Sequence, residues 1–401
     1  MKLPLQALQS REGMAALVAA LGPDQVRYVG GCVRDLRLGL PINDVDLATR
    51  LQPDAVIERL SEAGIRSVPT GLEHGTVTAL IPAGPVEVTT LRRDVSTDGR
   101  RATVAFTDDW REDAARRDFT FNALSADPAS GEIFDYFDGI ADLEQRKVRF
   151  IGEPLTRIAE DHLRILRFFR FHARFGTAEA DAAALEACRV RANDLMALSR
   201  ERIAEELLKL LNLADPAPTL GLMIDNGILK PVLPEITSDG VERLETLIAR
   251  EEAAALDPQA LRRLAALLPP DPELAAAIAA RLRLSTKALK RLVSAASRAE
   301  PAREEPRVLA YRIGMEEAMD CLLLGDDDPA AAIARLRGWE KPRLAVGGGD
   351  LVAMGLKAGP VVANTLKQIE REWSANGFTA NVEEQRALAR RHVDQALRVS
   401  Q

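Results

Sequence analysis

Two aspartates near the N-terminus, Asp44 and Asp46, have the spacing that most directly indicates chemistry. They lie in DVDLAT (44–49), whose valine, leucine and threonine predict a β-strand. Residues two apart on a strand point to the same face, so the two carboxylates would lie side by side. Because like charges repel, such a pair favours a cation between them. Mg²⁺, which prefers oxygen ligands, fits this site.

Residues that favour phosphate binding stand just before the aspartates. Gly30 and Gly31 end a predicted strand segment (26–31) and precede a short predicted helix that carries Arg34. Glycines let a phosphate approach the backbone, helix N-termini offer free N–H groups, and a guanidinium can donate two hydrogen bonds to phosphate oxygens. With the aspartates, this order predicts a site for a nucleoside triphosphate and a metal ion. The structural alternatives are a turn, a solvated strand end and an ion pair between Arg34 and Asp35.

The segment RRDFTFNAL (116–124) supplies a second group of candidate ligands. Arg117 can balance the charge of a triphosphate, and Asp118 can accept hydrogen bonds from a ribose with a 2′-hydroxyl. Asn122 can brace the same sugar or a backbone turn. An ion pair at a helix end, with Asn122 as a cap, is the structural alternative.

A third candidate region, 154–176, begins with proline and ends at glycine, which predicts one continuous helix. Its spacing places apolar residues on one face, and Asp161 followed by arginines on the other. Residues 146–174 contain eight Arg and Lys side chains but only three acidic ones, so a polyanion would bind there. The alternative is an arginine-rich solvated face.

In the predicted helix, Asp161 and Arg164 lie one turn apart, so both can face one nucleobase. The carboxylate can accept from the exocyclic amino group of cytosine or adenine, and the guanidinium can donate to the neighbouring ring acceptors. Uracil and guanine present a carbonyl oxygen in place of that amino group. The pair therefore predicts selection of CTP and ATP without a nucleic-acid template.

The elements that position these residues fall into two parts. Residues 1–150 alternate helices with predicted strands, which indicates an α/β domain, and the polar stretch 94–109 is predicted to be a mobile loop. After Gly152 nearly every segment reads as helical. The predicted strands are 26–31, 44–49, 76–81 and 86–91, and the predicted helix between them is 53–64.

The composition limits the classes of protein that are compatible with these motifs. The chain has 401 residues, 47% hydrophobic and 28% charged, which is enough for about two or three packed domains. Its net charge of −7 excludes a histone-like protein but allows a local basic groove. No run of about 18 apolar residues occurs, and the three cysteines are widely spaced. We therefore expect a cytoplasmic protein that contacts no membrane.

Five segments in this order resemble the motifs of the class II CCA-adding enzymes, or tRNA nucleotidyltransferases, and their poly(A) polymerase relatives in the polymerase-β nucleotidyltransferase superfamily. GGCVRD with DVD resembles the first motif, and RRDFTFNAL the ribose and triphosphate motif. DYFDGIADLEQRKVRFIG (135–152) resembles the hinge motif, and EDHLRILRFFRF (160–171) the base-reading motif. SRERIAEELLKLL (199–211) resembles the supporting helix motif, and 347–366 more loosely resembles a tail segment.

The resemblance implies an α/β nucleotidyltransferase head at 1–145, followed by an all-α neck (146–215), body (216–340) and tail (341–401). It implies that CMP and AMP are added from CTP and ATP to the 3′ end of tRNA, with release of pyrophosphate. The tail would bind tRNA, and no protein partner is expected. Asp44 and Asp46 become catalytic Mg²⁺ ligands, and superfamily members often add a third carboxylate, here Glu87. The implied nucleotide ligands are Gly31, Arg34, Arg117, Asp118, Asn122, Asp161 and Arg164, with Arg167 and Arg170 as helpers.

Other functions stay open from the sequence. A poly(A) polymerase is one, although the basic and aromatic run typical of those relatives after the helix motif is missing. An enzyme that adds only CC or only A would share the same motifs. Outside catalysis, the fold could serve an RNA-binding protein or a nucleotide-binding regulator, against which the paired aspartates and the basic helix argue respectively.

Overall fold

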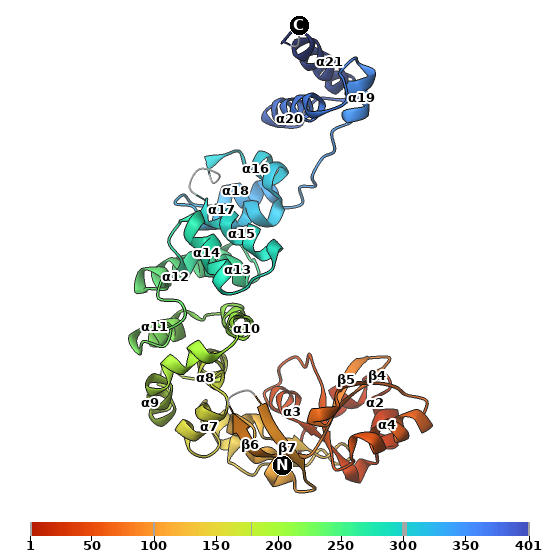
Figure 1. Cartoon of the computed structure of the whole chain (residues 1–401), viewed down its shortest axis with the longest axis vertical. Coiled ribbons are helices and arrows are strands. Elements are labelled where there is room, and N and C mark those ends of the chain that lie inside the picture. Colours follow the sequence, from red (N-terminus) through yellow and green to blue (C-terminus); the bar gives the residue numbers. More distant parts are fainter. Residues whose placement is uncertain (1, 99–100, 178, 299–302, 400–401) are drawn as a thin grey trace. The chain divides into compact units, whose positions relative to one another are not determined.

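The computed structural model describes residues 2–98, 101–177, 179–298 and 303–399, with the side chains of 94–98, 101–104 and 399 left aside. Contacts divide the chain into two compact units, Met1–Pro234 and Glu235–Gln401, called unit 1 and unit 2 below. All the described strands lie in the N-terminal part of unit 1, which is red to orange in Figure 1, and the rest is helical. This confirms the predicted α/β part followed by helices. The finer division into head, neck, body and tail stays a prediction.

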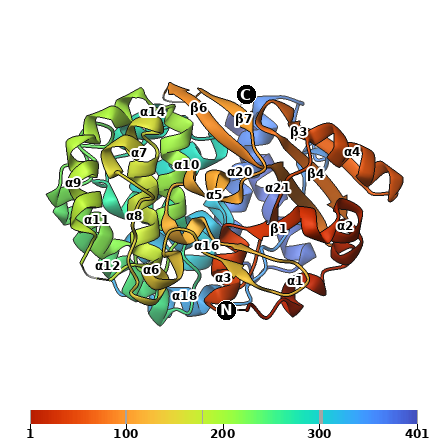
Figure 2. The same cartoon turned by 90° about the horizontal axis from the view of Figure 1, so that it is seen from below.

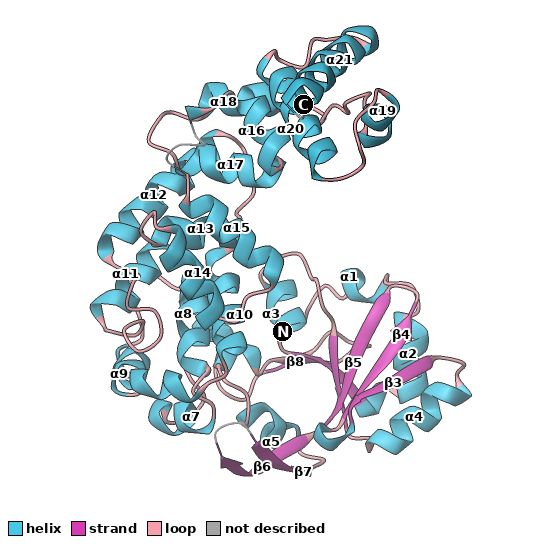
Figure 3. Ribbon diagram, turned by 45° about the horizontal axis from the view of Figure 1, so that its top comes forward, coloured by secondary structure: helices cyan, strands magenta, loops and turns pink. Residues whose placement is uncertain are grey.

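A seven-stranded mixed sheet forms the centre of the N-terminal part, in the order β3-β4-β5-β2-β1-β8-β9. β2 and β5 run parallel, and the other neighbours are antiparallel. Helix α4 packs on β3, β4 and β5, and α2 packs on β4 (Figure 3). The strands are β1 (Val26–Val29), β2 (Asp46–Thr49), β3 (Arg66–Gly71), β4 (Thr76–Ile81), β5 (Gly84–Thr90), β8 (Ser125–Ala126) and β9 (Ile133–Phe134).

The helices around this sheet are short, and α3 follows the short predicted helix that carries Arg34. The predicted helix 53–64 is α4, and the predicted strands correspond to β1, β2, β4 and β5. The helices are α1 (Gln6–Gln9), α2 (Met14–Leu21), α3 (Gly31–Arg37), α4 (Pro53–Glu62), α5 (Trp110–Ala115) and α6 (Gly139–Glu144), with 3-10 turns at Pro23–Gln25, Leu72–His74 and Thr120–Asn122.

Unit 1 continues into a group of helices that pack on one another around α8, as Figure 2 shows. Seven buried phenylalanines join this group to the N-terminal part, with ring centroids 4.8 Å apart for Phe119 and Phe150 and 5.3 Å for Phe119 and Phe171. The interlocked rings fix α8 against the segment 116–124. The helices are α7 (Pro154–Glu160), α8 (Arg164–Phe175), α9 (Ala182–Val190), α10 (Arg200–Leu211) and α11 (Ala217–Asp225), with a 3-10 turn at Ala192–Ala197.

Unit 2 is helical throughout its described residues. Its interior includes an ion-pair network in which Glu251 and Asp320, each at most 1% exposed, bind Arg262, Arg263 and Arg291. The helices are α12 (Ser238–Ala253), α13 (Ala260–Leu267), α14 (Pro272–Arg281), α15 (Thr286–Ala296), α16 (Pro306–Ile313), α17 (Met315–Leu324), α18 (Ala330–Leu336), α19 (Gly348–Ala353), α20 (Pro360–Ala375) and α21 (Val382–Val399).

The structure corrects three local predictions. Asp44 lies before the strand, which begins at Asp46, so strand alternation does not align the two carboxylates. The predicted loop 94–109 is largely an antiparallel hairpin, β6 (Arg92–Asp98) paired with β7 (Arg101–Phe106). The predicted helix 154–176 is two helices, α7 and α8, because Asp161 takes an extended conformation (φ −151°, ψ 107°) between them.

The three cysteines, Cys32, Cys188 and Cys321, are free and buried. Burial raises the pKa of Cys32 and of Cys321 to about 11, and it also raises the pKa of Cys188. Within the described part of the chain, no helix combines the length and the apolar character needed to cross a membrane.

Candidate active site

One cavity in unit 1, with a volume of about 470 Å³, gathers nearly all the residues singled out by their types and spacing. This volume is within the usual range for small-molecule sites, about 300–1,000 Å³. Of the residues predicted for the site, Asp44 and the additional carboxylate Glu87 are not among those that line it. The lining residues are Gly30, Gly31, Arg34, Asp46, Arg117, Asp118, Asn122, Asp161, Arg164, Arg167, Arg170, Phe171 and Arg174.

Gly30 and Gly31 line the cavity at the junction of β1 and α3. Gly30 has φ +69°, a left-handed conformation that side chains rarely adopt. A Cβ atom on Gly30 would lie 2.9 Å from Nη1 of Arg117, which is closer than real Cβ contacts. The absent side chain therefore lets the Arg117 guanidinium reach the loop, where its other contacts are Asp113 (3.3 Å) and the Asn122 carbonyl (3.4 Å).

Arg34 is 4% exposed and held on three sides. It donates to Asp35 over 2.8 Å and to Oδ1 of Asn122, and its guanidinium carbon lies 4.8 Å from the ring centroid of Phe175. Burial lowers the pKa of Arg34, while the neighbouring Asp35 carboxylate opposes the decrease. These contacts fix the guanidinium at the cavity wall, as a ligand for an anion requires. The predicted Arg34–Asp35 ion pair is therefore present beside the ligand candidates and does not replace them.

Acidic side chains gather at the first residue of β2. The parallel register sets Asp46 opposite Glu87 of β5. Burial raises the pKa of the Asp46 carboxyl, the charge of Glu87 adds to the rise, Arg117 opposes it, and Asp44 adds a smaller rise. Asp44 is exposed and lies near enough to act on Asp46 through its charge. The three carboxylates form a local excess of negative charge and repel one another. A cation bound beside them would relieve this repulsion.

This donor set fits a Mg²⁺ ion that is completed by substrate. Within the described residues, no three His, Cys, Asp or Glu side chains are grouped closely enough to hold a metal ion alone. Mg²⁺ is usually bound by one or two carboxylates together with substrate phosphates. Asp46 and the neighbouring Asp44 can supply the carboxylates of that pattern. The arginines that line the same cavity can hold the substrate phosphates that complete it.

Asp118 is the most firmly held carboxylate of the cavity. It accepts hydrogen bonds from Arg167 (2.7 Å), Asn122 (2.9 Å) and the Phe119 amide (2.9 Å). Burial alone would raise its pKa, but Arg167 and these hydrogen bonds lower the pKa to about 2. Asp118 is thus an anion at any physiological pH, and it can accept a hydrogen bond from a ribose only by sharing its oxygens with Arg167 and Asn122.

The break between α7 and α8 determines the position of Asp161. One carboxylate oxygen accepts from the Leu163 amide (3.1 Å), which competes with helix continuation, and the other pairs with Arg202 of α10 (2.7 Å). Arg164 is 9% exposed and donates to the carbonyls of Arg157 (2.6 Å) and Arg116 (3.2 Å) and to Glu160. Asp161 and Arg164 therefore line the same cavity, as predicted. The break between α7 and α8 brings them together, whereas the prediction placed them on one face of a continuous helix.

Helix α10 holds the arginines of α8 from behind. Glu206 is 3% exposed and pairs with Arg170 (2.6 Å) and with Arg167 (3.7 Å). Arg202, one turn before Glu206, holds Asp161. Sequence reasoning identified this helix as a support but did not name these two residues, because their partners lie 36 to 41 positions away.

Three further lining residues, Gly30, Phe171 and Arg174, were not among the predicted ligands. Arg174 pairs with Asp35 (3.3 Å) and lies one turn after Arg170, so extending the arginine face of the predicted helix by one turn would have found it. Phe171 gives the cavity an aromatic wall, 4.3 Å from the guanidinium carbon of Arg170. In total, six arginines line the cavity against three aspartates, an arrangement suited to a polyphosphate.

Comparison with known families defines the class of the N-terminal part. The family model described as "Poly A polymerase head domain" matches residues 26–149. A second model, described as "Probable RNA and SrmB- binding site of polymerase A", matches residues 181–239. The head is therefore that of the poly(A) polymerase class of nucleotidyltransferases.

Full-length relatives narrow the class to one family. The mouse (Mus musculus) protein "CCA tRNA nucleotidyltransferase 1, mitochondrial" is 34% identical over 403 residues, which cover 96% of this chain and 92% of the mouse protein. The "CCA-adding enzyme" of Limosilactobacillus fermentum is 32% identical over 367 residues, covering 86% and 87%. The chain belongs to the family of CCA-adding tRNA nucleotidyltransferases, which confirms the resemblance seen in its motifs.

A solved structure agrees with this assignment over the whole chain. The CCA-adding enzyme of Bacillus stearothermophilus, crystallised in complex with CTP, superimposes with a TM-score of 0.69 at 26% identity. The match covers 98% of this chain and 99% of that enzyme. The α/β head followed by helices is thus the fold of this family, and the protein is an enzyme of the nucleotidyltransferase class.

Proposed function

We propose that this protein adds CMP and AMP, from CTP and ATP, to the 3′ end of tRNA without a nucleic-acid template. The observation that carries the proposal is the single cavity in which triphosphate ligands, a carboxylate for a metal ion and the Asp161–Arg164 pair lie together. The names of the relatives support the tRNA substrate, and the CTP complex of the Bacillus enzyme supports a nucleotide in this fold.

In the proposed reaction, the 3′-hydroxyl of the RNA attacks the α-phosphate of the nucleotide, and pyrophosphate leaves. Arg34 and Arg117 bind the triphosphate, with Gly31 allowing its close approach, and Arg167 and Arg170 assist Asp161 and Arg164 at the base. Asp118 and Asn122 orient the ribose. Asp44 and Asp46 would hold Mg²⁺, which when bound lowers the pKa of the attacking hydroxyl and stabilises the leaving group.

Base selection is assigned to Asp161 and Arg164. Arg202 and the Leu163 amide hold the Asp161 carboxylate, and each of its oxygens retains a lone pair that can accept from an amino group. The Nε–H of Arg164 makes no hydrogen bond to any described residue, so it is available to a ring acceptor. A carbonyl oxygen opposite Asp161 would leave two acceptors facing each other, which disfavours UTP and GTP.

The tail and body are proposed to contact tRNA through its shape and backbone. We also place the activity in the cytoplasm, which fits three unpaired, buried cysteines. The four-part division at 145, 215 and 340 is retained as the working description of the chain.

The deciding experiment uses purified protein with tRNA that ends at the discriminator base. It is given CTP, ATP or both, and the products are sized to one nucleotide. Extension by three nucleotides only with both substrates supports CCA addition. Two nucleotides from CTP with no further growth when ATP is also supplied indicates a CC-adding enzyme, and a long ladder with ATP indicates a poly(A) polymerase. Binding of tRNA without any incorporation would leave a non-catalytic RNA-binding protein.

A further inference from the structure

A second arginine cluster lies in unit 2, far along the chain from the residues of the nucleotide cavity. A cavity of about 360 Å³ is lined by Arg243 and Arg250 of α12, by Arg298 after α15, and by the end of α17. Asp326 is the one acidic residue among its described lining residues, and its side chain is exposed. The proposed reaction uses none of these residues.

Hydrogen bonds to helix ends hold two of the three guanidiniums in place. Arg243 donates to the carbonyls of Ala266 (2.9 Å) and Leu267 (3.3 Å) at the end of α13. Arg250 donates to the carbonyls of Leu323 (2.8 Å) and Gly325 (2.6 Å) at the end of α17. A guanidinium has five N–H donors, so each keeps others for a ligand after making these two bonds.

Arg298 is 6% exposed, yet it is poorly compensated. Its hydrogen bonds to described residues are two long ones, both 3.4 Å, to the carbonyls of Ala265 and Ala295. Burial lowers the pKa of Arg298 and the charge of Arg243 lowers it further, while the charge of the exposed Asp326 opposes the decrease. Among the described residues, no carboxylate lies within ion-pair distance of Arg243, Arg250 or Arg298. A buried cation without a counter-charge is costly unless an anion joins it.

Other buried arginines of unit 2 each have a carboxylate partner. Arg262, Arg263 and Arg291 are as buried as Arg298, and each is neutralised by Glu251 or Asp320 at 2.6 to 2.9 Å. Among the residues that the structure describes, the cluster at the smaller cavity has no such partner. This contrast indicates that its counter-charge comes from a ligand.

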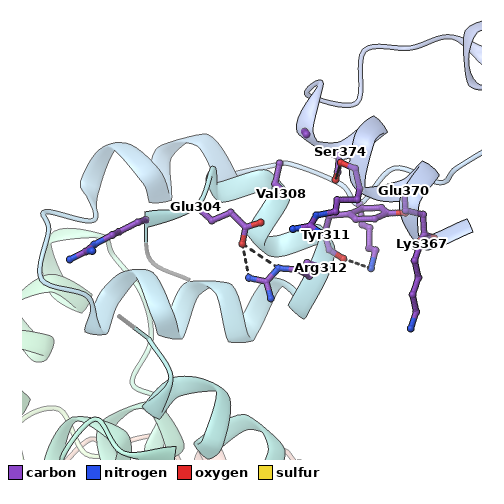
Figure 4. Close-up of a pocket in the computed structure, with 11 residues that line it drawn as sticks. Glu304, Val308, Tyr311, Arg312, Lys367, Glu370 and Ser374 are labelled. Atoms are coloured by element: carbon purple, nitrogen blue, oxygen red, sulfur yellow. Dashed lines mark hydrogen bonds and ion pairs between the residues drawn. The ribbon is translucent and has the colours of Figure 1, made fainter. Parts of the chain in front are cut away.

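A larger cavity of unit 2 does not provide an equally strong case. It has a volume of about 1,080 Å³ and is lined by α16 and α20 (Figure 4). Its cations are partly compensated, since Arg312 pairs with Glu304 (2.6 Å) and Lys341 donates to the Tyr311 carbonyl (2.8 Å). Lys367 and Arg371 are exposed surface side chains.

We propose that Arg243, Arg250 and Arg298 form a binding site for one phosphate group. Three guanidiniums around one cavity match the several acceptor oxygens of a tetrahedral phosphate, to which arginine donates charge-assisted hydrogen bonds. The phosphate can come from the backbone of a bound RNA or from a free phosphate ion. The site does not depend on nucleotidyl transfer, so it can fail while the proposed function stands, and the reverse.

The first test measures thermal unfolding of the full chain in inorganic phosphate, with chloride at matched ionic strength as the reference. Wild-type protein should melt at a higher temperature in phosphate, because a ligand that binds only the folded state stabilises it. Arg298→Met should lose this increase. Without phosphate it should melt no lower than wild type, since it removes an uncompensated buried charge. Arg312→Met, in the larger cavity, should keep the phosphate effect.

A second variant tests the site in the opposite direction. Asp326→Asn removes the acidic residue at the edge of the cavity and should tighten phosphate binding about threefold at low salt. Asp327→Asn changes the charge of the neighbouring exposed residue, which does not line the cavity, and should have a smaller effect. A gain of binding cannot result from misfolding, so this pair is informative even if Arg298→Met does not fold.

Binding of a tRNA transcript at two salt concentrations identifies the source of the phosphate. If the RNA backbone occupies the site, Arg298→Met should weaken binding about fivefold and lower the slope of log affinity against log salt by about 1. If only the free ion binds, tRNA affinity stays unchanged while the phosphate-dependent stabilisation is lost. Equal phosphate effects in wild type, Arg298→Met and Asp326→Asn, with unchanged tRNA affinity, would overturn the proposal.

Discussion

The nucleotide cavity of unit 1 and the buried network of unit 2 both pair carboxylates with guanidiniums, but the pairs differ in their exposure to solvent. In unit 2, Glu251 and Asp320 are at most 1% exposed and bind three arginines that are at most 8% exposed. In unit 1, Asp118 and Glu206 also bind arginines, but Arg167 has a side chain that is 31% exposed and lines a cavity. The first arrangement is closed, and the second keeps donors available.

The comparison shows that the surroundings of an ion pair determine its role. A closed, buried network contributes little net stability, but removal of one partner leaves a charge unpaired in the interior. A pair at a cavity instead fixes a guanidinium so that its remaining donors meet a ligand without a large ordering cost. Damage to the buried network of unit 2 should therefore appear as lost stability, and damage to the nucleotide cavity of unit 1 as lost catalysis.

The most severe loss is expected from Asp46→Ala, with Asp46→Asn as the variant that keeps the shape. Removing a metal ligand should reduce incorporation of both CMP and AMP by about 1,000-fold or more, equivalent to about 4 kcal/mol. The affinity for tRNA should change little. The free energy of unfolding should also change little, because the substitution removes the repulsion between Asp46 and Glu87. Asp44→Ala should follow the same pattern.

Single-turnover incorporation with each nucleotide measures this effect. Asp24→Asn, which alters an exposed acid of the same unit, is the control and should retain full activity. A mutant of Asp46 with a tenth of the wild-type rate would contradict the assignment.

In unit 2, Asp320→Ala should destabilise the fold by about 3–5 kcal/mol, because Arg262 and Arg291 lose a buried partner. Denaturant unfolding followed by Trp339 and Trp373, which belong to unit 2, reports this loss. Glu316→Ala is the matched control: its side chain is 61% exposed and also pairs with Arg291, so its loss should cost less than about 1 kcal/mol. Equal costs for the two variants would show that burial does not distinguish them.

Asp161→Ala should relax base selection by about 1–3 kcal/mol for UTP and GTP relative to CTP and ATP. Unfolding should change less than in Asp320→Ala, because Asp161 belongs to a cavity. The measurement is kcat/KM for all four nucleotides on one tRNA, with Asp194→Ala as the control for loss of a nearby acid. A uniform decrease for every nucleotide would assign Asp161 a structural role instead.

The smallest effect concerns pH. The pKa of Asp118 is lowered to about 2 in the folded protein, so the stability it contributes is fully present above its unfolded value, near 3.8. That contribution, about 2 kcal/mol, is lost progressively as pH falls from about 3.8 to about 2. The stability difference between wild type and Asp118→Asn, followed by Trp110 of unit 1, should be constant from pH 7 to about pH 5. A difference that shrinks within that interval would contradict the Asp118–Arg167 pair.

The sequence predicted four of the strands, and it singled out most of the residues that line the cavity, because their signals are local. Periodicity and flanking glycine or proline identified β1, β2, β4, β5 and α4. The type and order of residues in GGCVRD, DVD and RRDFTFNAL were enough to collect a ligand set that the structure brings to one cavity. Helical content after Gly152 was equally readable from spacing.

Long-range contacts explain most of what was missed. The break at Asp161 depends on Arg202, 41 positions away, while the helical spacing of apolar residues continues through it. Glu206 was not recognised for the same reason. The β6–β7 hairpin was missed because the polar composition of the segment predicts a loop, and the pairing of the two strands leaves little local pattern.

The three buried cysteines have a practical consequence for measuring motion in this enzyme. Thiol-reactive dyes attack the thiolate, and burial raises the pKa of Cys32, Cys188 and Cys321, so the native thiols are both covered and protonated at neutral pH. A cysteine introduced at an exposed position would be labelled selectively in the otherwise unchanged protein. One dye on each unit would then report, by energy transfer, how the distance between them changes with each added nucleotide.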